Sequence, residues 1–190
     1  MVAHVRTFGL SGITGFSVDA EINIAKGLPD FDIIGMGNMA VREAAGRIRA
    51  ALENSGYPFP LGRVTVNLAP AGIRKEGACY DLAIAVGILL CGSYAGVRTD
   101  AFAFIGELSL DGFLRPVRGV LPMMQEAARR GIAKCIVPLE NADEAVLTDA
   151  CRIYPAASLP EVLQILTSKR NAWPRPEEPA PSRSDCGDYR

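Results

Sequence analysis

The fold is decided by one continuous stretch, Arg63-Val-Thr-Val-Asn-Leu68, Ala69-Pro-Ala-Gly-Ile-Arg-Lys-Glu-Gly-Ala-Cys-Tyr80 and Asp81-Leu-Ala-Ile-Ala-Val-Gly-Ile-Leu-Leu90. The first segment alternates apolar and polar residues, which predicts a half-buried strand. The last segment is almost wholly apolar, and a helix that is apolar all round must be covered on most sides. We therefore expect a central helix that the chain enters through a polar loop.

This polar loop allows a functional and a structural interpretation. A loop that a rigid scaffold holds in place is a common position for a binding or catalytic site. The plainer alternative is that Lys75, Glu76 and Asp81 only cap and solubilise the start of the central helix.

Composition limits the class of protein. The chain has 190 residues, of which 49% are hydrophobic, and this is enough for one sizeable core. A formal net charge of −1 argues against a broad electrostatic surface for nucleic acid and leaves room only for a local patch. The first residues do not resemble a signal peptide, and the apolar run 82–92 is too short for a bilayer. We expect a soluble cytoplasmic protein without a membrane partner.

The cysteine and histidine pattern does not favour a metal site. The chain has five cysteines and one histidine, His4, and no cysteine pair has C-x-x-C spacing. Reduced thiols are therefore expected, with no metal bound.

Before the central helix we expect two paired strands, a third strand and a helix, at 2–10, 16–25, 30–35 and 38–56. Asn38 is the predicted N-cap of this helix, and its arginines Arg47 and Arg49 are expected to face water. Gly35-Met-Gly-Asn-Met-Ala40 matches a dinucleotide fingerprint. We reject that reading because a hairpin precedes the strand, and because the strand ending at Asn67 carries no acidic residue for a ribose.

After the central helix, strands and helices alternate. We expect strands at 101–108, 134–138 and 152–154, an Asp111-Gly112 turn, and helices at 118–131, 141–147 and 159–167. Alternation of this kind predicts parallel pairing in this half, and the whole is an α/β sandwich with a mixed sheet. The proline-rich composition from about Lys169 predicts a domain at 1–168 and an extended or disordered linker at 169–190.

Several blocks, taken together, resemble the amino-terminal domain of the ComM/YifB family of magnesium-chelatase-like AAA+ ATPases. They are Asp19 to Gly35, Val64 to Pro70, Arg74 to Gly77 with Tyr80 to Ala85, Gly106 to Gly112 and Leu114 to Pro122. The resemblance covers roughly Val2 to Leu166. It implies the Lon-protease catalytic fold, a two-layer mixed-sheet sandwich of the ribosomal-protein-S5 domain-2 type.

The resemblance also implies cofactors and partners. The family's ATPase module, which binds ATP and Mg, follows such a linker, and this chain contains no G-x-x-x-x-G-K-[ST] motif of its own. We therefore expect no cofactor in this chain and a homo-hexameric full-length protein. Relatives similar to ComM act in DNA branch migration during natural transformation, which makes single-stranded or branched DNA a candidate partner.

Lon-type proteases use a serine–lysine dyad, and the resemblance places Cys79 at the serine position. The lysine falls near Leu121, which cannot take a proton, and Lys75 and Arg118 are the nearest cations in the sequence. The expectation is a non-catalytic domain. The alternative is a degenerate Lon-like peptidase with Cys79 as its nucleophile.

Four cations of the resembling blocks are the candidate contacts for DNA or a neighbouring subunit: Arg74, Lys75, Arg115 and Arg118. In a Lon-like fold, the two segments that carry them approach the same region. The alternative is that these cations pair with the acids of the same blocks, Glu76, Asp81, Glu107 and Asp111.

Overall fold

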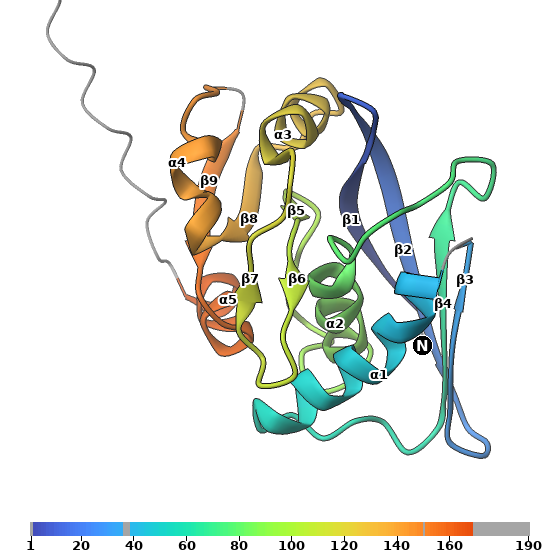
Figure 1. Cartoon of the computed structure of the whole chain (residues 1–190). Coiled ribbons are helices and arrows are strands. Elements are labelled where there is room, and N and C mark those ends of the chain that lie inside the picture. The colour runs from blue at the N-terminus through green and yellow to red at the C-terminus, as the bar shows by residue number, and fades with distance from the viewer. Residues whose placement is uncertain (1, 36–38, 150, 169–190) are drawn as a thin grey trace, which may run out of the picture.

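A four-stranded sheet forms the first half of the protein (Figure 1). The computed structural model describes residues 2–35, 39–149 and 151–168. Along the sheet the strands run β1 (Val2–Ser11), β2 (Thr14–Ala25), β4 (Arg63–Ala69) and β3 (Asp30–Ile34). β1 and β2 pair in antiparallel fashion, which confirms the predicted hairpin. The alternation of β4 is confirmed as well, because its two valines and its leucine are buried.

The connection from β3 to β4 corrects one expectation. The two strands pair in parallel, and α1 (Met39–Asn54) links them. The third strand therefore does open a βαβ unit, so the hairpin argument against the dinucleotide fingerprint was wrong, while the missing acidic residue remains. The predicted cap Asn38 lies outside the described residues. Gly56, with φ of 85°, follows the helix end as predicted, and its N–H donates to the backbone carbonyl of Glu53.

The second half contains a parallel sheet of its own in the order β5 (Phe102–Phe104), β8 (Lys134–Pro138) and β9 (Arg152–Ala156). The helices of this half are α3 (Val120–Arg129), α4 (Ala142–Ala145) and α5 (Leu159–Thr167), and the 3-10 turn η1 (Leu139–Asn141) precedes α4. The predicted strand–helix alternation and parallel pairing of this half are confirmed.

The single strand expected at 101–108 is divided in two. After β5 the chain turns away from β8, because Gly106 donates to the carbonyl of Cys79 (3.0 Å) and accepts from the N–H of Leu82 (3.1 Å). Beyond this point β6 (Glu107–Leu108) pairs with β7 (Leu114–Arg115) as a separate hairpin. The chain between them turns at Gly112, with φ of 83°, as the Asp111-Gly112 pattern predicted.

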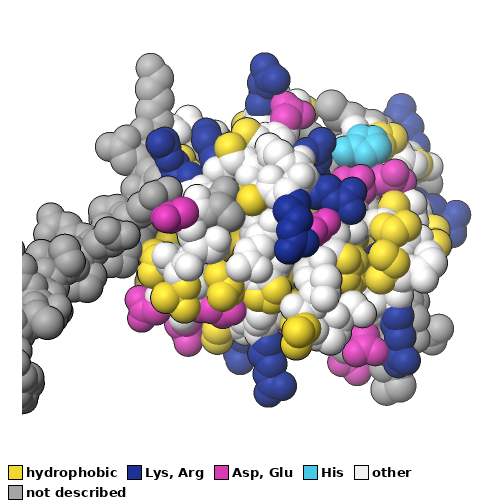
Figure 2. All heavy atoms as spheres, turned by 90° about the horizontal axis from the view of Figure 1, so that it is seen from above, with side chains coloured by type: hydrophobic (Ala, Val, Ile, Leu, Met, Phe, Trp, Pro, Cys, Tyr) yellow, Lys and Arg dark blue, Asp and Glu magenta, His cyan; other side chains and the backbone are white. Residues whose placement is uncertain are grey.

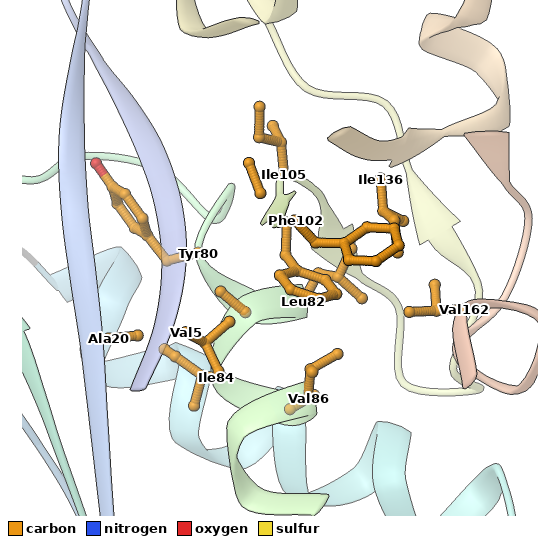
Figure 3. Close-up of a cluster of buried hydrophobic side chains, with 14 of the residues drawn as sticks. Val5, Ala20, Tyr80, Leu82, Ile84, Val86, Phe102, Ile105, Ile136 and Val162 are labelled. Carbon is orange, nitrogen blue, oxygen red and sulfur yellow. The ribbon is translucent and has the colours of Figure 1, made fainter. Parts of the chain in front are cut away.

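The core is continuous across both halves and is centred on α2 (Asp81–Leu90), of which every residue is buried. Figure 3 shows Leu82, Ile84 and Val86 of α2 between Val5 and Ala20 on one side and Ile136 and Val162 on the other. The central, fully covered helix is therefore confirmed. Among the described residues, no helix is both long and apolar enough to cross a membrane.

Candidate functional site at the start of α2

The polar loop before α2 is held from inside by Lys75. This side chain is fully buried, and its ammonium donates to the carbonyls of Pro70 and Ile73, the latter at 3.0 Å. Burial lowers the pKa of the lysine below its ordinary value. Lys75 therefore shapes the loop and is not exposed on the surface, so it does not belong to an exposed cationic patch.

Cys79 ends this loop and is also buried. Its thiol lies 3.8 Å from the carbonyl oxygen of Phe8 in β1. Burial, aided by the negative charges of Asp81 and Glu107, raises the pKa of Cys79 to about 12. A catalytic thiol needs the reverse, a neighbour that stabilises the thiolate.

A pocket of about 470 Å³ opens beside Cys79 between the loop, β6 and the start of α3. Its charged lining residues are Glu76, Glu107 and Arg118. A guanidinium does not give up its proton in proteins, so Arg118 cannot act as a general base. Leu121 does not line the pocket; it lies in the first turn of α3, where its N–H donates to Glu144 (3.1 Å).

Asp81, the first residue of α2, is the second buried charge at this site. Arg47 of α1 binds its carboxylate through Nε at 2.8 Å and through Nη2 at 3.2 Å, and the N–H of Leu108 donates to it at 3.3 Å. Burial raises the pKa of Asp81 to about 6, while the bond to Arg47 opposes this shift. The pair joins α1, α2 and β6 at one point.

This ion pair corrects two expectations. Arg47 was expected to face water, but its side chain is only 20% exposed. Arg49, expected to be solvated too, is exposed as predicted, and its guanidinium lies 4.4 Å from the centre of the Phe59 ring. The sequence suggested that Asp81 caps the central helix or forms an ion pair with one of the four candidate cations. Its ion-pair partner is instead Arg47 of α1. Arg47 and Asp81 are 34 residues apart in the sequence, and no sequence pattern predicted that they would pair.

The structure brings the remaining candidate cations only partly together. Arg74 is exposed and pairs with Glu76 at 2.8 Å, as the ion-pair alternative expected. Arg115 and Arg118 are both exposed, but they line different pockets on either side of Pro116, which lines both. On the face that Figure 2 shows, Lys and Arg side chains are interspersed with Asp and Glu.

A metal ion would need a group of side chains that could bind it. Within the described ranges, no three His, Cys, Asp or Glu side chains are grouped so that they could hold a metal ion. None of the four cysteines that the structure describes forms a disulfide.

Together the fold and this loop define a mixed α/β domain that carries a buried thiol at the start of its central helix. The family model for subunit ChlI of Mg-chelatase matches residues 20–141. The chain belongs to this magnesium-chelatase-like family. This agrees with the resemblance inferred from the sequence blocks.

Individual relatives support the same grouping. Competence protein ComM of Haemophilus influenzae is 38% identical over 169 residues, which cover 88% of this chain and 33% of that protein. The uncharacterized protein YifB of Escherichia coli is 37% identical over 174 residues, or 91% of this chain and 34% of that protein. The chain thus spans about a third of the length of these relatives.

A more distant similarity bears on the fold. Lon protease 2 of Bacillus subtilis is 33% identical over 159 residues, which cover 80% of this chain and 28% of that protein. This similarity agrees with the predicted Lon-like α/β fold class, which the observed sheets and helices confirm.

Proposed function

We propose that this chain is the non-catalytic amino-terminal domain of a magnesium-chelatase-like AAA+ ATPase of the ComM type. In this proposal the domain serves assembly and DNA handling, such as branch migration in natural transformation. The ATPase module, with ATP and Mg, would lie outside this chain, which has no P-loop motif. The full-length protein would be a cytoplasmic homo-hexamer that acts on single-stranded or branched DNA.

The environment of Cys79 is the observation that carries the non-catalytic assignment. The residue at the nucleophile position is a buried thiol whose pKa is raised to about 12, and the only cation that lines its pocket within the described residues is Arg118. Lys75, the other cation close in sequence, directs its ammonium to two carbonyls of its own loop. A nucleophile without a base or a thiolate-stabilising neighbour supports no covalent catalysis.

The alternative function, a degenerate peptidase, is favoured by one observation: Cys79 lines a pocket, in a chain that is similar to Lon proteases. A thiol-reactive peptide probe separates the two. If the domain is non-catalytic, the probe labels Cys79 no faster than a plain alkylating reagent of the same chemistry does. Rapid labelling that depends on the peptide, and that Cys79→Ala abolishes, would establish the peptidase instead.

DNA handling is tested through Arg115 and Arg118, the two exposed candidates that form no ion pair within the described residues. Each phosphate contact that an arginine makes releases counterions, so its loss weakens binding and reduces the salt slope by about one. The measurement is a titration of branched and single-stranded DNA with the chain at several salt concentrations. We expect Arg115→Ala and Arg118→Ala to weaken binding and to lower the slope.

Arg98→Ala is the control, because Arg98 is 90% exposed and lines neither pocket; unlike the two test residues, it pairs with an exposed acid, Asp100, at 3.2 Å. It should leave affinity and slope unchanged. If both pocket variants are folded and bind as the wild type does, the DNA role of these arginines is excluded and an assembly role remains.

A further inference from the structure

A second pocket, of about 520 Å³, lies beside the β6–β7 hairpin, and we name it the hairpin groove. Its apolar lining includes Phe113, Pro116 and Leu139, and its charged lining includes Asp111, Arg115 and Glu140. Phe113 is 54% exposed and Leu139 is 45% exposed. Single exposed apolar side chains are ordinary, but two large ones that line the same pocket indicate a surface that something covers.

The hairpin groove is preformed, because its walls are tied to the start of α5. Leu114 of β7 donates to the carbonyl of Ala157 (2.9 Å), and Leu159 donates to the carbonyl of Gly112 (2.9 Å). Ala157 itself lines the groove. The groove thus lies at one end of α5, and the chain after α5 begins at the other end of the same helix.

We propose that the hairpin groove binds the proline-rich segment of this same chain that contains Trp173-Pro-Arg-Pro176, with the indole of Trp173 against Phe113 and Leu139. This inference does not depend on the proposed function. The segment follows α5, and Trp173 is the only tryptophan of the chain. Proline-rich segments favour the polyproline II conformation, and such segments commonly dock in grooves lined by aromatic and apolar side chains.

The length of the connection fits this placement. The nine residues of α5 span about 13 Å at 1.5 Å per residue. Five residues lead from Ser168 to Trp173, and five extended residues reach about 17 Å. The chain can therefore return along α5 and bring Trp173 back to the level of Ala157. A connection of two or three residues would have been too short.

Charge complementarity favours the same occupant. The charged residues that line the groove are two acids, Asp111 and Glu140, and one base, Arg115. The lining therefore carries a net charge of −1. Arg175 is the one charged residue of Trp173-Pro-Arg-Pro176 and brings a positive charge to this rim, whereas Glu177 and Glu178 come after the segment that docks. The lowered pKa of Asp111, held down chiefly by the hydroxyl of Ser109, keeps that carboxylate ionised.

A modest contact is enough to hold the segment in place. A short connection gives an effective concentration of the order of 1 mM, so a contact with a dissociation constant of about 0.1 mM would be closed about nine-tenths of the time. A variant that weakens the contact tenfold would leave about half of the molecules open at the same ~1 mM effective concentration. The expected changes are therefore large enough to measure.

The single tryptophan provides the test in the 190-residue chain. We expect the emission of Trp173 to be blue-shifted from that of free tryptophan amide and its quenching by acrylamide to be severalfold weaker. Both signals should move toward those of the free amide in Phe113→Ala and in Leu139→Ala. The matched control is Leu28→Ala, since Leu28 is 88% exposed and lies at the β2–β3 turn.

Three results would overturn the proposal. The first is a tryptophan as accessible in the wild type as in the free amide. The second is shielding that the two groove variants leave unchanged while circular dichroism shows both to be folded. The third is shielding that disappears on dilution, since the occupant would then be a second copy of the chain. Arg175→Glu offers a further measurement that leaves the groove intact, and it should increase quenching.

Discussion

At the scale of single residues, Cys79 gives the sharpest prediction. At pH 8 an ordinary cysteine is ionised to about a tenth or more, whereas a thiol with a pKa of about 12 is ionised to about one part in ten thousand. We expect Cys79 in the folded chain to react with iodoacetamide about a thousandfold more slowly than in the unfolded chain. Mass spectrometry of peptides after timed labelling measures both rates.

The labelling control is the same chain in urea, where every cysteine is accessible. Cys79→Ala should fold with stability close to that of the wild type, since alanine fills most of the volume of a thiol side chain. Labelling of folded Cys79 at the rate seen in urea would contradict the buried, protonated thiol.

Asp81 gives a prediction about pH with an unusual sign. Its pKa is about 6 in the folded chain, above the ordinary value of 3.8, so the folded state holds this proton more tightly than the unfolded state does. This contribution to stability is present at low pH and is lost as the pH rises through 6. Between pH 7.5 and pH 5 the wild type should gain about 1 kcal/mol relative to Asp81→Asn.

Urea unfolding of both proteins at the two pH values measures this difference. The side-chain amide introduced by Asp81→Asn can still accept a hydrogen bond from the N–H of Leu108, which makes this variant the closest uncharged match. If the wild type instead loses stability relative to the variant at pH 5, the attraction of Arg47 outweighs the burial of the carboxylate.

The residue scale is also where prediction from sequence was weakest. The position of Cys79 at the start of the buried helix could be predicted, because the resemblance fixed it and the apolar pattern located the helix. The burial of Lys75 could not, because the sequence around it is polar and its partners are backbone carbonyls. The pairing of Arg47 with Asp81 depends on how α1 crosses α2, which no local pattern encodes.

At the scale of elements, α2 lies close to the sheet through Gly87. A Cβ atom at this position would lie 2.2 Å from Cδ1 and 2.8 Å from Cγ1 of Ile22, a fully buried residue of β2. Alanine in a helix is normally favoured over glycine by up to about 1 kcal/mol, but overpacking a core costs about 1–3 kcal/mol. We expect Gly87→Ala to destabilise the chain, as measured by its melting temperature.

Gly46→Ala is the matched control in α1. Gly46 is exposed, and no heavy atom outside its own helix neighbourhood lies within 4 Å of an added Cβ. This variant should be more stable than the wild type by about 0.5–1 kcal/mol. A Gly87→Ala variant that is stabilised as Gly46→Ala is would show that β2 can move to admit the methyl group.

The predicted bounds of helices and strands agree with the structure where the apolar periodicity is strong. They differ where hydrogen bonds to backbone groups far away in the sequence end or divide an element. The strand at β8 and the helix at α5 have the predicted bounds. The strand expected at 101–108 is broken because the backbone of Gly106 forms hydrogen bonds with the carbonyl of Cys79 and the N–H of Leu82. Asn141, the first residue of the helix predicted at 141–147, is the N-cap residue of α4, but its side chain binds the backbone of Val117 through two hydrogen bonds of 2.9 Å.

At the scale of the whole molecule, one core joins two different sheets. The mixed sheet β1-β2-β4-β3 and the parallel sheet β5-β8-β9 share no strand among the described residues, yet their buried residues form a single cluster around α2. Strands of both sheets contact this helix, so each sheet buries apolar side chains against the same element. The two halves should therefore unfold as one cooperative unit, as small domains usually do.

A substitution far from the first sheet tests this cooperativity. Ile136 in β8 is fully buried, and Ile136→Ala should cost about 2–5 kcal/mol through lost burial and a cavity. If the core is a single unit, hydrogen exchange of the most protected amides in β4 should accelerate together with that of amides in β8, by the same free energy. Ile136→Val, which removes one methyl group, should give a smaller but equally shared change. Loss of protection in β8 with unchanged protection in β4 would mean that the two halves open independently, and α2 would then belong energetically to the first sheet alone.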